Sequence, residues 1–332
     1  MKAAILTEKG FIFKDVPDPS PKENEVVIKV KSAGICGTDL AIFKGSYKIN
    51  LPRILGHEFA GVIEEVGRSV KKFKVGDRVT SEINVTCGKC FYCKHGMPTH
   101  CLNRKAIGIS RDGAFAEYVV VPAENVHRLP KNISFDEGTF IEPLAAAIQT
   151  FEMAPIKKGD TVAIYGSGKM ALLILQVAKV YGAGKVIVIG RTPKKLELAK
   201  TLGADVTINV HEGDPVETVK EETEGIGADM VVEATGDPSV LQNVVKMVRS
   251  RGTISIKSTH GLQARLDVTE IVVRELKIQG SRCGNFIKAI EMLRKGHVKV
   301  NPLISATYPL SKIEEAFNEA LKSETVKIIL KP

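Results

Sequence analysis

The chain has no tryptophan, and only 5% of its 332 residues are aromatic. It also has no long apolar run, since the most apolar stretch, residues 170–178, is short and contains Gln176. A transmembrane helix needs about 20 apolar residues, so no membrane partner is expected. Residues 1–13 carry Glu8, Lys9 and Gly10 where a secretory signal needs an unbroken apolar segment. We therefore expect a cytoplasmic protein.

Blocks of one charge sign are also missing, although the formal net charge is +9. Lysine and arginine are spread along the chain among acidic residues. This pattern is typical of a solvated basic surface, which could attract a phosphate-bearing cofactor, and it does not favour a nucleic-acid partner. The length and the 44% apolar content indicate a globular protein with room for two domains.

Hydrophobic patterning divides the chain into two regions. Residues 1–143 are β-rich, with short apolar runs at 25–30, 61–66, 78–79 and 115–121. Further on, six predicted strands alternate with helices, at 161–165, 185–189, 206–209, 230–234, 253–256 and 276–279. This alternation predicts an α/β fold with a doubly wound parallel sheet. Two amphipathic helices, 286–295 and 312–322, and a strand at 327–330 follow.

A glycine motif, Gly166-x-Gly168-x-x-Ala171, follows the first strand of this sheet and opens a helix. Glycines in that context let the backbone approach a pyrophosphate at the helix N-terminus. The alternative is a glycine turn that only permits tight packing. We predict a dinucleotide site lined by Gly166, Ser167, Gly168, Lys169 and Met170.

The second strand ends at Gly190-Arg191, with Lys195 shortly after. An acidic residue there would bind the adenosine ribose of NAD, and none is present. Arg191 could instead pair with a 2′-phosphate. We therefore predict a preference for NADP over NAD, and we expect Gly190→Asp with Arg191→Ile to reverse it. The alternative is a solvated basic turn that still accepts NAD.

Four cysteines cluster as Cys87-x2-Cys90-x2-Cys93-x7-Cys101. Four thiolates form a closed tetrahedral zinc site with no open position, which is structural and not catalytic. Redox-active thiols and a nucleic-acid-binding zinc ribbon are the alternatives.

A second set of metal-ligand types lies upstream. Cys36 and His57 are good zinc ligands, and Asp39 and Glu58 are acids beside them in the sequence. An open zinc site needs three protein ligands and leaves a position for substrate. The alternative is that these side chains are simply packed in the interior.

At this point the chain resembles the zinc-containing medium-chain dehydrogenase family over essentially its whole length. The signature G-H-E-x2-G-x5-G-x2-V runs from Gly56 to Val70. The resemblance implies that Cys36 and His57 are catalytic zinc ligands and that Thr38 is the proton-relay hydroxyl. It also implies that Asp39 orients His57 and that Glu58 can exchange with water on the metal.

The resemblance extends to a third ligand. The segment Phe140–Leu144 is similar to the branch of polyol, sugar and threonine dehydrogenases, and it implies that Glu142 binds zinc directly or through water. Lys327 resembles the basic residue that lies near the cofactor pyrophosphate. One departure concerns Ala41, where many relatives carry a proton-relaying histidine.

The resemblance implies a GroES-like catalytic domain, 1–145 plus 283–332, with a structural zinc lobe at about 87–101. A Rossmann domain would cover 146–282. The implied function is zinc-dependent hydride transfer between a nicotinamide cofactor and a secondary alcohol, polyol or sugar. We expect two zinc ions per chain and a homo-dimer or homo-tetramer. A zinc-independent quinone or enoyl reductase on the same scaffold and a nucleic-acid-binding zinc protein are the alternatives.

Overall fold

The computed structural model describes residues 1–259 and 261–332. The chain forms two compact units, Met1–Glu142 with Leu303–Pro332, and Pro143–Pro302. No helix in the described part of the chain is long and apolar enough to cross a membrane.

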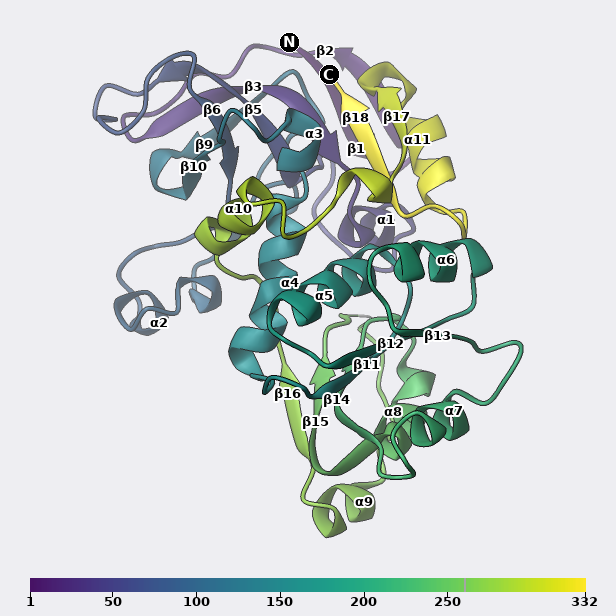
Figure 1. Ribbon diagram of the computed structural model, residues 1–332. Coiled ribbons are helices and arrows are strands. Elements are labelled where there is room, and N and C mark those ends of the chain that lie inside the picture. Colours follow the sequence, from purple (N-terminus) through teal and green to yellow (C-terminus); the bar gives the residue numbers. More distant parts are fainter. Residues whose placement is uncertain (260) are drawn as a thin grey trace. The chain divides into compact units, whose positions relative to one another are not determined.

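The first unit is built mainly of antiparallel sheet (Figure 1). Its largest sheet has the order β10-β6-β5-β3-β18-β17, and β9 also pairs with β3. The strands of this sheet are β3 (Glu25–Gly34), β5 (Glu58–Val66), β6 (Arg78–Ser81), β9 (Tyr118–Pro122), β10 (Val126–Arg128), β17 (Ile304–Pro309) and β18 (Lys327–Lys331). Because β3 pairs with three strands, most of its side chains are buried.

Smaller elements complete this unit. A three-stranded sheet joins β1 (Lys2–Thr7), β2 (Gly10–Asp15) and β4 (Arg53–Ile54), and a short pair joins β7 (Asn84–Val85) and β8 (Lys105–Ala106). The helices are α1 (Gly37–Phe43), α2 (Phe91–Lys94), α3 (Phe135–Gly138) and α11 (Ile313–Ala320). The aromatic rings of Phe59, Phe115 and Phe317 are buried in the core of the unit.

The register of this sheet brings the predicted metal ligands together. In the antiparallel pair of β3 and β5, Gly34 lies opposite Glu58. Cys36 follows Gly34 by two residues, and His57 directly precedes Glu58, so the two segments emerge beside each other. On the other side of β3, Ile329 of β18 also pairs with Gly34, which brings Lys327 to the same end of the sheet.

The second unit contains the predicted parallel sheet, in the order β13-β12-β11-β14-β15-β16. All five neighbouring pairs are parallel. The strands are β11 (Thr161–Tyr165), β12 (Lys185–Gly190), β13 (Val206–Asn209), β14 (Ala228–Glu233), β15 (Val248–Ile256) and β16 (Lys277–Gly280). This order is that of a dinucleotide-binding sheet and confirms the predicted fold class.

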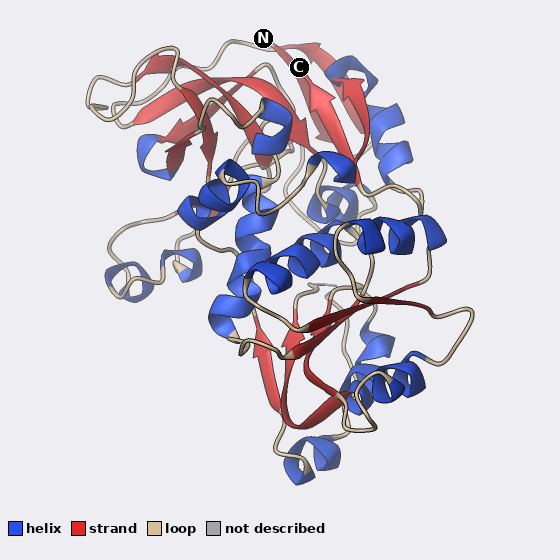
Figure 2. Cartoon of the chain, in the orientation of Figure 1, coloured by secondary structure: helices blue, strands red, loops and turns tan. Residues whose placement is uncertain are grey.

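Helices cover both faces of this sheet (Figures 1 and 2). The helices of the unit are α5 (Lys169–Val180), α6 (Pro193–Thr201), α7 (Pro215–Glu221), α8 (Leu241–Met247), α9 (Val268–Val273) and α10 (Phe286–Arg294). Helices α5 and α6 pack on β11, β12 and β13, whereas α8 packs on β14 and β15. Helix α4 (Ile141–Met153) begins in the first unit and continues into the second.

The unit boundary differs from the expected one at its C-terminal end. We expected residues 283–332 in the catalytic domain, but residues 283–302 group with the second unit. The reason is local bonding: Gln176 on α5 exchanges two hydrogen bonds with the backbone of Lys299, and Lys288 on α10 forms an ion pair with Glu152 on α4. The chain therefore re-enters the first unit only at Leu303.

Candidate metal centres and cofactor cradle

Three of the predicted ligands form one group in the first unit. Single ligand atoms of Cys36, His57 and Glu58 all lie within 4.8 Å of one another. Cys36 is the N-cap residue of α1, and its backbone N–H donates to the Asp39 carboxylate at 2.9 Å. His57 and Glu58 are buried at the start of β5. The fold thus brings Cys36 together with His57 and Glu58 of the zinc signature.

Asp39 lies behind His57. Its Oδ1 is 3.6 Å from His57 Nδ1, which is too long for a good hydrogen bond, and neither atom has a hydrogen-bond partner although both are buried. Burial alone lowers the pKa of His57, but the charges of Asp39 and Cys36 reverse this and raise it to about 9. A surplus of buried negative charge around an imidazole is what a divalent cation would balance. The donor set therefore fits a zinc ion, and His57 Nδ1 lies on the side of the ring that faces Asp39.

Thr38 and Glu142 lie beside this group. Thr38 Oγ1 is 3.9 Å from Cys36 Sγ on the first turn of α1. Glu142 stands in the first turn of α4, outside the tight group of three, but its negative charge helps to raise the pKa of His57. Both residues are thus near the group, and their roles stay predictions.

Lys327 has a partner that the sequence did not indicate. Its ammonium group is fully buried and forms an ion pair with Glu58, and its expected place near the cofactor pyrophosphate stays a prediction. It also lies 5.4 Å from the centre of the Phe140 ring. Burial lowers the pKa of Lys327 to about 8, against the opposing influence of the Cys36 and Asp39 charges. Because β18 runs beside β3, Lys327 is directed at the metal-ligand group.

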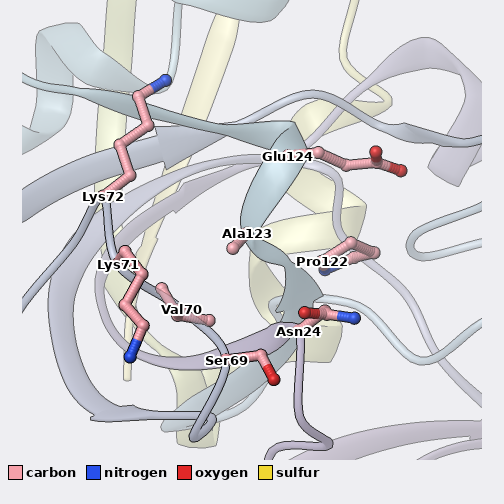
Figure 3. Close-up of a pocket in the computed structure, with 8 residues that line it drawn as sticks. All are labelled: Asn24, Ser69, Val70, Lys71, Lys72, Pro122, Ala123 and Glu124. Carbon is pink, nitrogen blue, oxygen red and sulfur yellow. The ribbon is translucent and has the colours of Figure 1, made fainter.

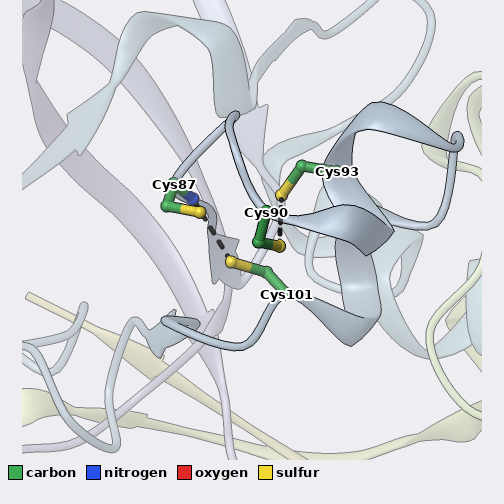
Figure 4. Close-up of side chains that lie close together, drawn as sticks. All are labelled: Cys87, Cys90, Cys93 and Cys101. Atoms are coloured by element: carbon green, nitrogen blue, oxygen red, sulfur yellow. Dashed lines mark hydrogen bonds between the residues drawn. The ribbon is translucent and has the colours of Figure 1, made fainter.

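The four clustered cysteines form a second group of sulfur ligands (Figure 4). All four sulfur atoms lie within 4.8 Å of one another, and those of Cys90 and Cys93 are 3.5 Å apart. Zn–S bonds of about 2.3 Å in a tetrahedron place sulfur atoms ~3.8 Å apart, so the spacing fits a zinc ion. All six cysteines of the chain, each among the described residues, are thiols and not disulfides.

Backbone geometry supports this cysteine lobe. Gly88 and Gly96 adopt φ values of +67° and +73°, which side-chain-bearing residues rarely adopt. Hydrogen bonds from the backbone N–H groups of Lys89 and Cys90 lower the pKa of Cys87 to about 6, which favours the thiolate that binds metal. Cys93 differs, since burial and the neighbouring thiols raise its pKa to about 11. A metal would have to displace the Cys93 proton.

The glycine motif forms the predicted turn between β11 and α5. Gly166 has φ +134°, and a Cβ there would lie 2.6 Å from the carbonyl oxygen of Ala234. Gly168 is the N-cap residue of α5, and a Cβ there would meet nothing within 4 Å. The helix N-terminus, which begins with Lys169 and Met170, is therefore open to the close approach of an anion.

At the end of β12, Arg191 and Lys195 lie close enough to interact. Burial lowers the pKa of Lys195, and the like charge of Arg191 lowers it further. Their like charges make the region around the start of α6 positive, which favours an anionic group there.

The first unit also has a shallow cavity of roughly 480 Å³ that contains none of the predicted site residues (Figure 3). It is lined by Asn24, Ser69, Val70, Lys71, Lys72, Pro122, Ala123 and Glu124. Its charged lining residues, Lys71, Lys72 and Glu124, carry both signs.

Comparisons with known proteins agree with this geometry. Residues 22–131 match the model of the alcohol dehydrogenase GroES-like domain, and residues 170–295 match that of the zinc-binding dehydrogenase domain. A sorbitol dehydrogenase from Halalkalibacterium halodurans is 36% identical, over 100% of this chain and 99% of its own length.

Solved structures are similar over the whole chain. A Sinorhizobium meliloti protein described as a zinc-binding dehydrogenase, bound to NADP, has a TM-score of 0.95 and 32% identity over 100% of this chain and 99% of its own. An Escherichia coli alcohol dehydrogenase complexed with NADH has a TM-score of 0.94 and 33% identity over the same shares. The chain therefore belongs to the zinc-containing medium-chain alcohol and polyol dehydrogenase family. It is an NAD(P)-dependent oxidoreductase of alcohols or polyols.

Proposed function

We propose that this chain moves a hydride between NADP and a secondary alcohol carbon of a polyol or sugar. The observation that carries the proposal is the buried group of Cys36, His57 and Glu58, with ligand atoms within 4.8 Å, in a chain that also has an open glycine cradle. A polyol is favoured because a carboxylate, Glu142, stands where simple alcohol dehydrogenases carry a thiol. The 36% identity to a sorbitol dehydrogenase supports the same choice.

The residues around the metal-ligand group have distinct roles in this proposal. A zinc ion bound there would lower the pKa of the substrate hydroxyl. Thr38, next to Cys36, accepts the proton from that hydroxyl. Asp39 fixes the orientation of His57. Ala41 offers no imidazole, so the proton leaves through water or through a ribose hydroxyl of the cofactor.

Two carboxylates compete for the third ligand position. Lys327 already neutralises Glu58 through a buried ion pair. We therefore assign the third position to Glu142, directly or through water, and assign Glu58 as the carboxylate that exchanges with it. The four thiolates of Cys87, Cys90, Cys93 and Cys101 would hold a second, structural zinc ion, giving two per chain.

The preference for NADP rests on the end of β12. No carboxylate follows this strand to bind the 2′-hydroxyl of NAD, and Arg191 can pair with a 2′-phosphate. Lys195, which is influenced by the charge of Arg191, adds to the local positive potential.

We also propose a cytoplasmic homo-dimer or homo-tetramer. All six cysteines are thiols and not disulfides, which supports a reducing compartment. Exposed apolar side chains on α9 and at the edge strand β16, among them Val272, Val273 and Ile278, support contact between copies of the chain.

The test is a substrate panel of simple secondary alcohols, polyols, sugars, polyol phosphates and threonine, each with NAD and with NADP, on protein of measured zinc content. The proposal expects the highest kcat/KM for a polyol or sugar with NADP, and loss of turnover in Cys36→Ser. Turnover of quinones or enoyl substrates by zinc-free protein would overturn it.

A further inference from the structure

Ser167 of the glycine motif lies beside Gly190, the last residue of β12. A Cβ built on Gly190 would lie 2.4 Å from Ser167 Oγ and 2.7 Å from Ser167 Cβ. The side chain of Ser167 thus occupies the place where any side chain of residue 190 would begin. Ser167 is itself only 8% exposed.

Rotation of the Ser167 side chain would not relieve its contact with a Cβ at position 190. The Oγ atom of Ser167 can turn about χ1, but its Cβ is fixed to the backbone and would still be 2.7 Å away. Leu196 Cδ2, at 3.2 Å, closes another direction. The φ angle of Gly190 is not in the left-handed region, so backbone strain does not explain the glycine. The reason for a glycine at position 190 is the space that Ser167 takes.

Position 190 matters because it ends the second strand of the dinucleotide sheet. In NAD-binding sheets of this kind, an acidic side chain near this position binds the ribose hydroxyls. Ser167 therefore lies at the base of the ribose-binding position. Its hydroxyl is neutral and can donate a hydrogen bond to a phosphate, whereas a carboxylate at this place would only accept and would repel the phosphate.

We propose that Ser167 is a specificity-determining residue for the cofactor: it excludes an acidic side chain from position 190 and presents its own hydroxyl to the 2′ substituent. The inference rests on the proposed NADP preference for its functional part. Its steric part stands independently, because it concerns only the packing of residues 167 and 190. It also revises the expectation that Gly190→Asp with Arg191→Ile suffices to change the cofactor, since Ser167 would obstruct the new carboxylate.

The steric part is tested with a double-mutant cycle in alanine and glycine. Gly190→Ala should lower Tm by about 2–12 °C through overpacking. Gly280→Ala is the matched control, because it also ends a strand of this sheet and its Cβ would meet nothing within 4 Å. In the Ser167→Gly background, Gly190→Ala should lower Tm much less than it does in the wild type. Additive effects, or a Gly190→Ala variant as stable as Gly280→Ala, would overturn the inference.

The functional part is tested by binding of NADPH and NADH, followed by cofactor fluorescence, in the purified enzyme. Ser167→Ala keeps the obstruction and removes the hydroxyl, so NADPH affinity should fall about threefold to tenfold, and more than NADH affinity. Gly190→Asp alone should weaken both cofactors, and Ser167→Gly/Gly190→Asp should bind NADH at least tenfold more tightly than Gly190→Asp does. Equal NADH affinity in these two variants would refute the role of Ser167 in selection.

The proposed NADP preference and the obstruction by Ser167 are refuted by different results. A wild-type enzyme that binds NADH more tightly than NADPH would refute the proposed cofactor, while a non-additive alanine cycle would still establish the obstruction. An additive cycle refutes the inference whichever cofactor the enzyme prefers.

Discussion

Replacing Lys327 by methionine should destabilise the first unit strongly. The ammonium group of Lys327 and the carboxylate of Glu58 are both fully buried and paired, and the ammonium also lies 3.5 Å from the carbonyl oxygen of Ile35. Methionine has a similar length and no charge, so the variant leaves Glu58 buried without its cation. Removing one partner of a buried pair costs about 3–5 kcal/mol. For a unit of this size that is a loss of roughly 6–20 °C in Tm.

The same strand provides a matched control. Lys331 on β18 pairs with Asp136, but the two side chains are 40% and 32% exposed. An exposed pair contributes about 0–1 kcal/mol because water screens it. Lys331→Met should therefore lower Tm by no more than roughly 4 °C. The two variants remove the same charge from the same strand and differ in burial.

The assay is thermal unfolding of zinc-loaded wild type and both variants, with zinc measured in each sample. A second variant combines Lys327→Met with Glu58→Gln. It removes the carboxylate charge that Lys327 balances in the wild type and should recover part of the lost stability. Equal Tm values for Lys327→Met and Lys331→Met would refute the reasoning. That result would mean that water or the metal compensates Glu58 as well as Lys327 does.

The remaining predictions concern the metals and one acid. Elemental analysis should find two zinc ions per chain, and a chelator should remove the open-site ion first; one ion or none at full activity would contradict this. Cys93→Ser should lower Tm and affect the chemical step less, whereas lost turnover at unchanged Tm would mean that the lobe is not structural. Glu142→Cys should keep the metal and lose activity on the native substrate; unchanged kinetics would place Glu142 away from the metal. Burial opposes ionisation of Asp205, but hydrogen bonds from Lys179 and the Val186 amide lower its pKa. Its stabilising contribution is thus present above the unfolded pKa of about 3.9 and is lost as pH falls through the folded pKa, so the Tm difference between wild type and Asp205→Asn should shrink on acidification below about pH 4.

The parallel sheet was the part of the fold that patterning predicted best. The strands expected at 161–165 and 206–209 have those bounds in the structure. The central strand β11 is buried on both faces, so it is a short continuous apolar run bounded by turns, whereas the edge strand β13 is only partly buried. The turn formed by the glycine motif could be predicted equally well, because it depends on glycines at fixed spacing between a strand and a helix.

Antiparallel strands with functional residues were harder to delimit. We expected a strand at 61–66, but β5 begins at Glu58. A glutamate at the start of a buried strand contradicts the apolar pattern, and the ion pair with Lys327 offsets the cost of burying its charge. Helix α4 was not predicted, although Pro143 in its first turn is compatible with a helix. The polar residues Glu58 and Glu142 interrupt the apolar patterns of β5 and α4, so the bounds of these elements could not be predicted from the patterns.

Two predicted functional positions, Lys327 and Gly190, share one physical feature. Sequence reasoning assigned Lys327 by its charge and its strand, and assigned Gly190 by the carboxylate that it lacks. In each case the structure adds a neighbour that the sequence did not indicate: Glu58, which is 269 positions away from Lys327, and Ser167, whose side chain lies where a Cβ of residue 190 would be. A residue type states which interactions are possible, but packing decides which one is made. For this reason the tests of both residues use paired variants, since a single substitution would measure the loss of a contact and could not identify the partner.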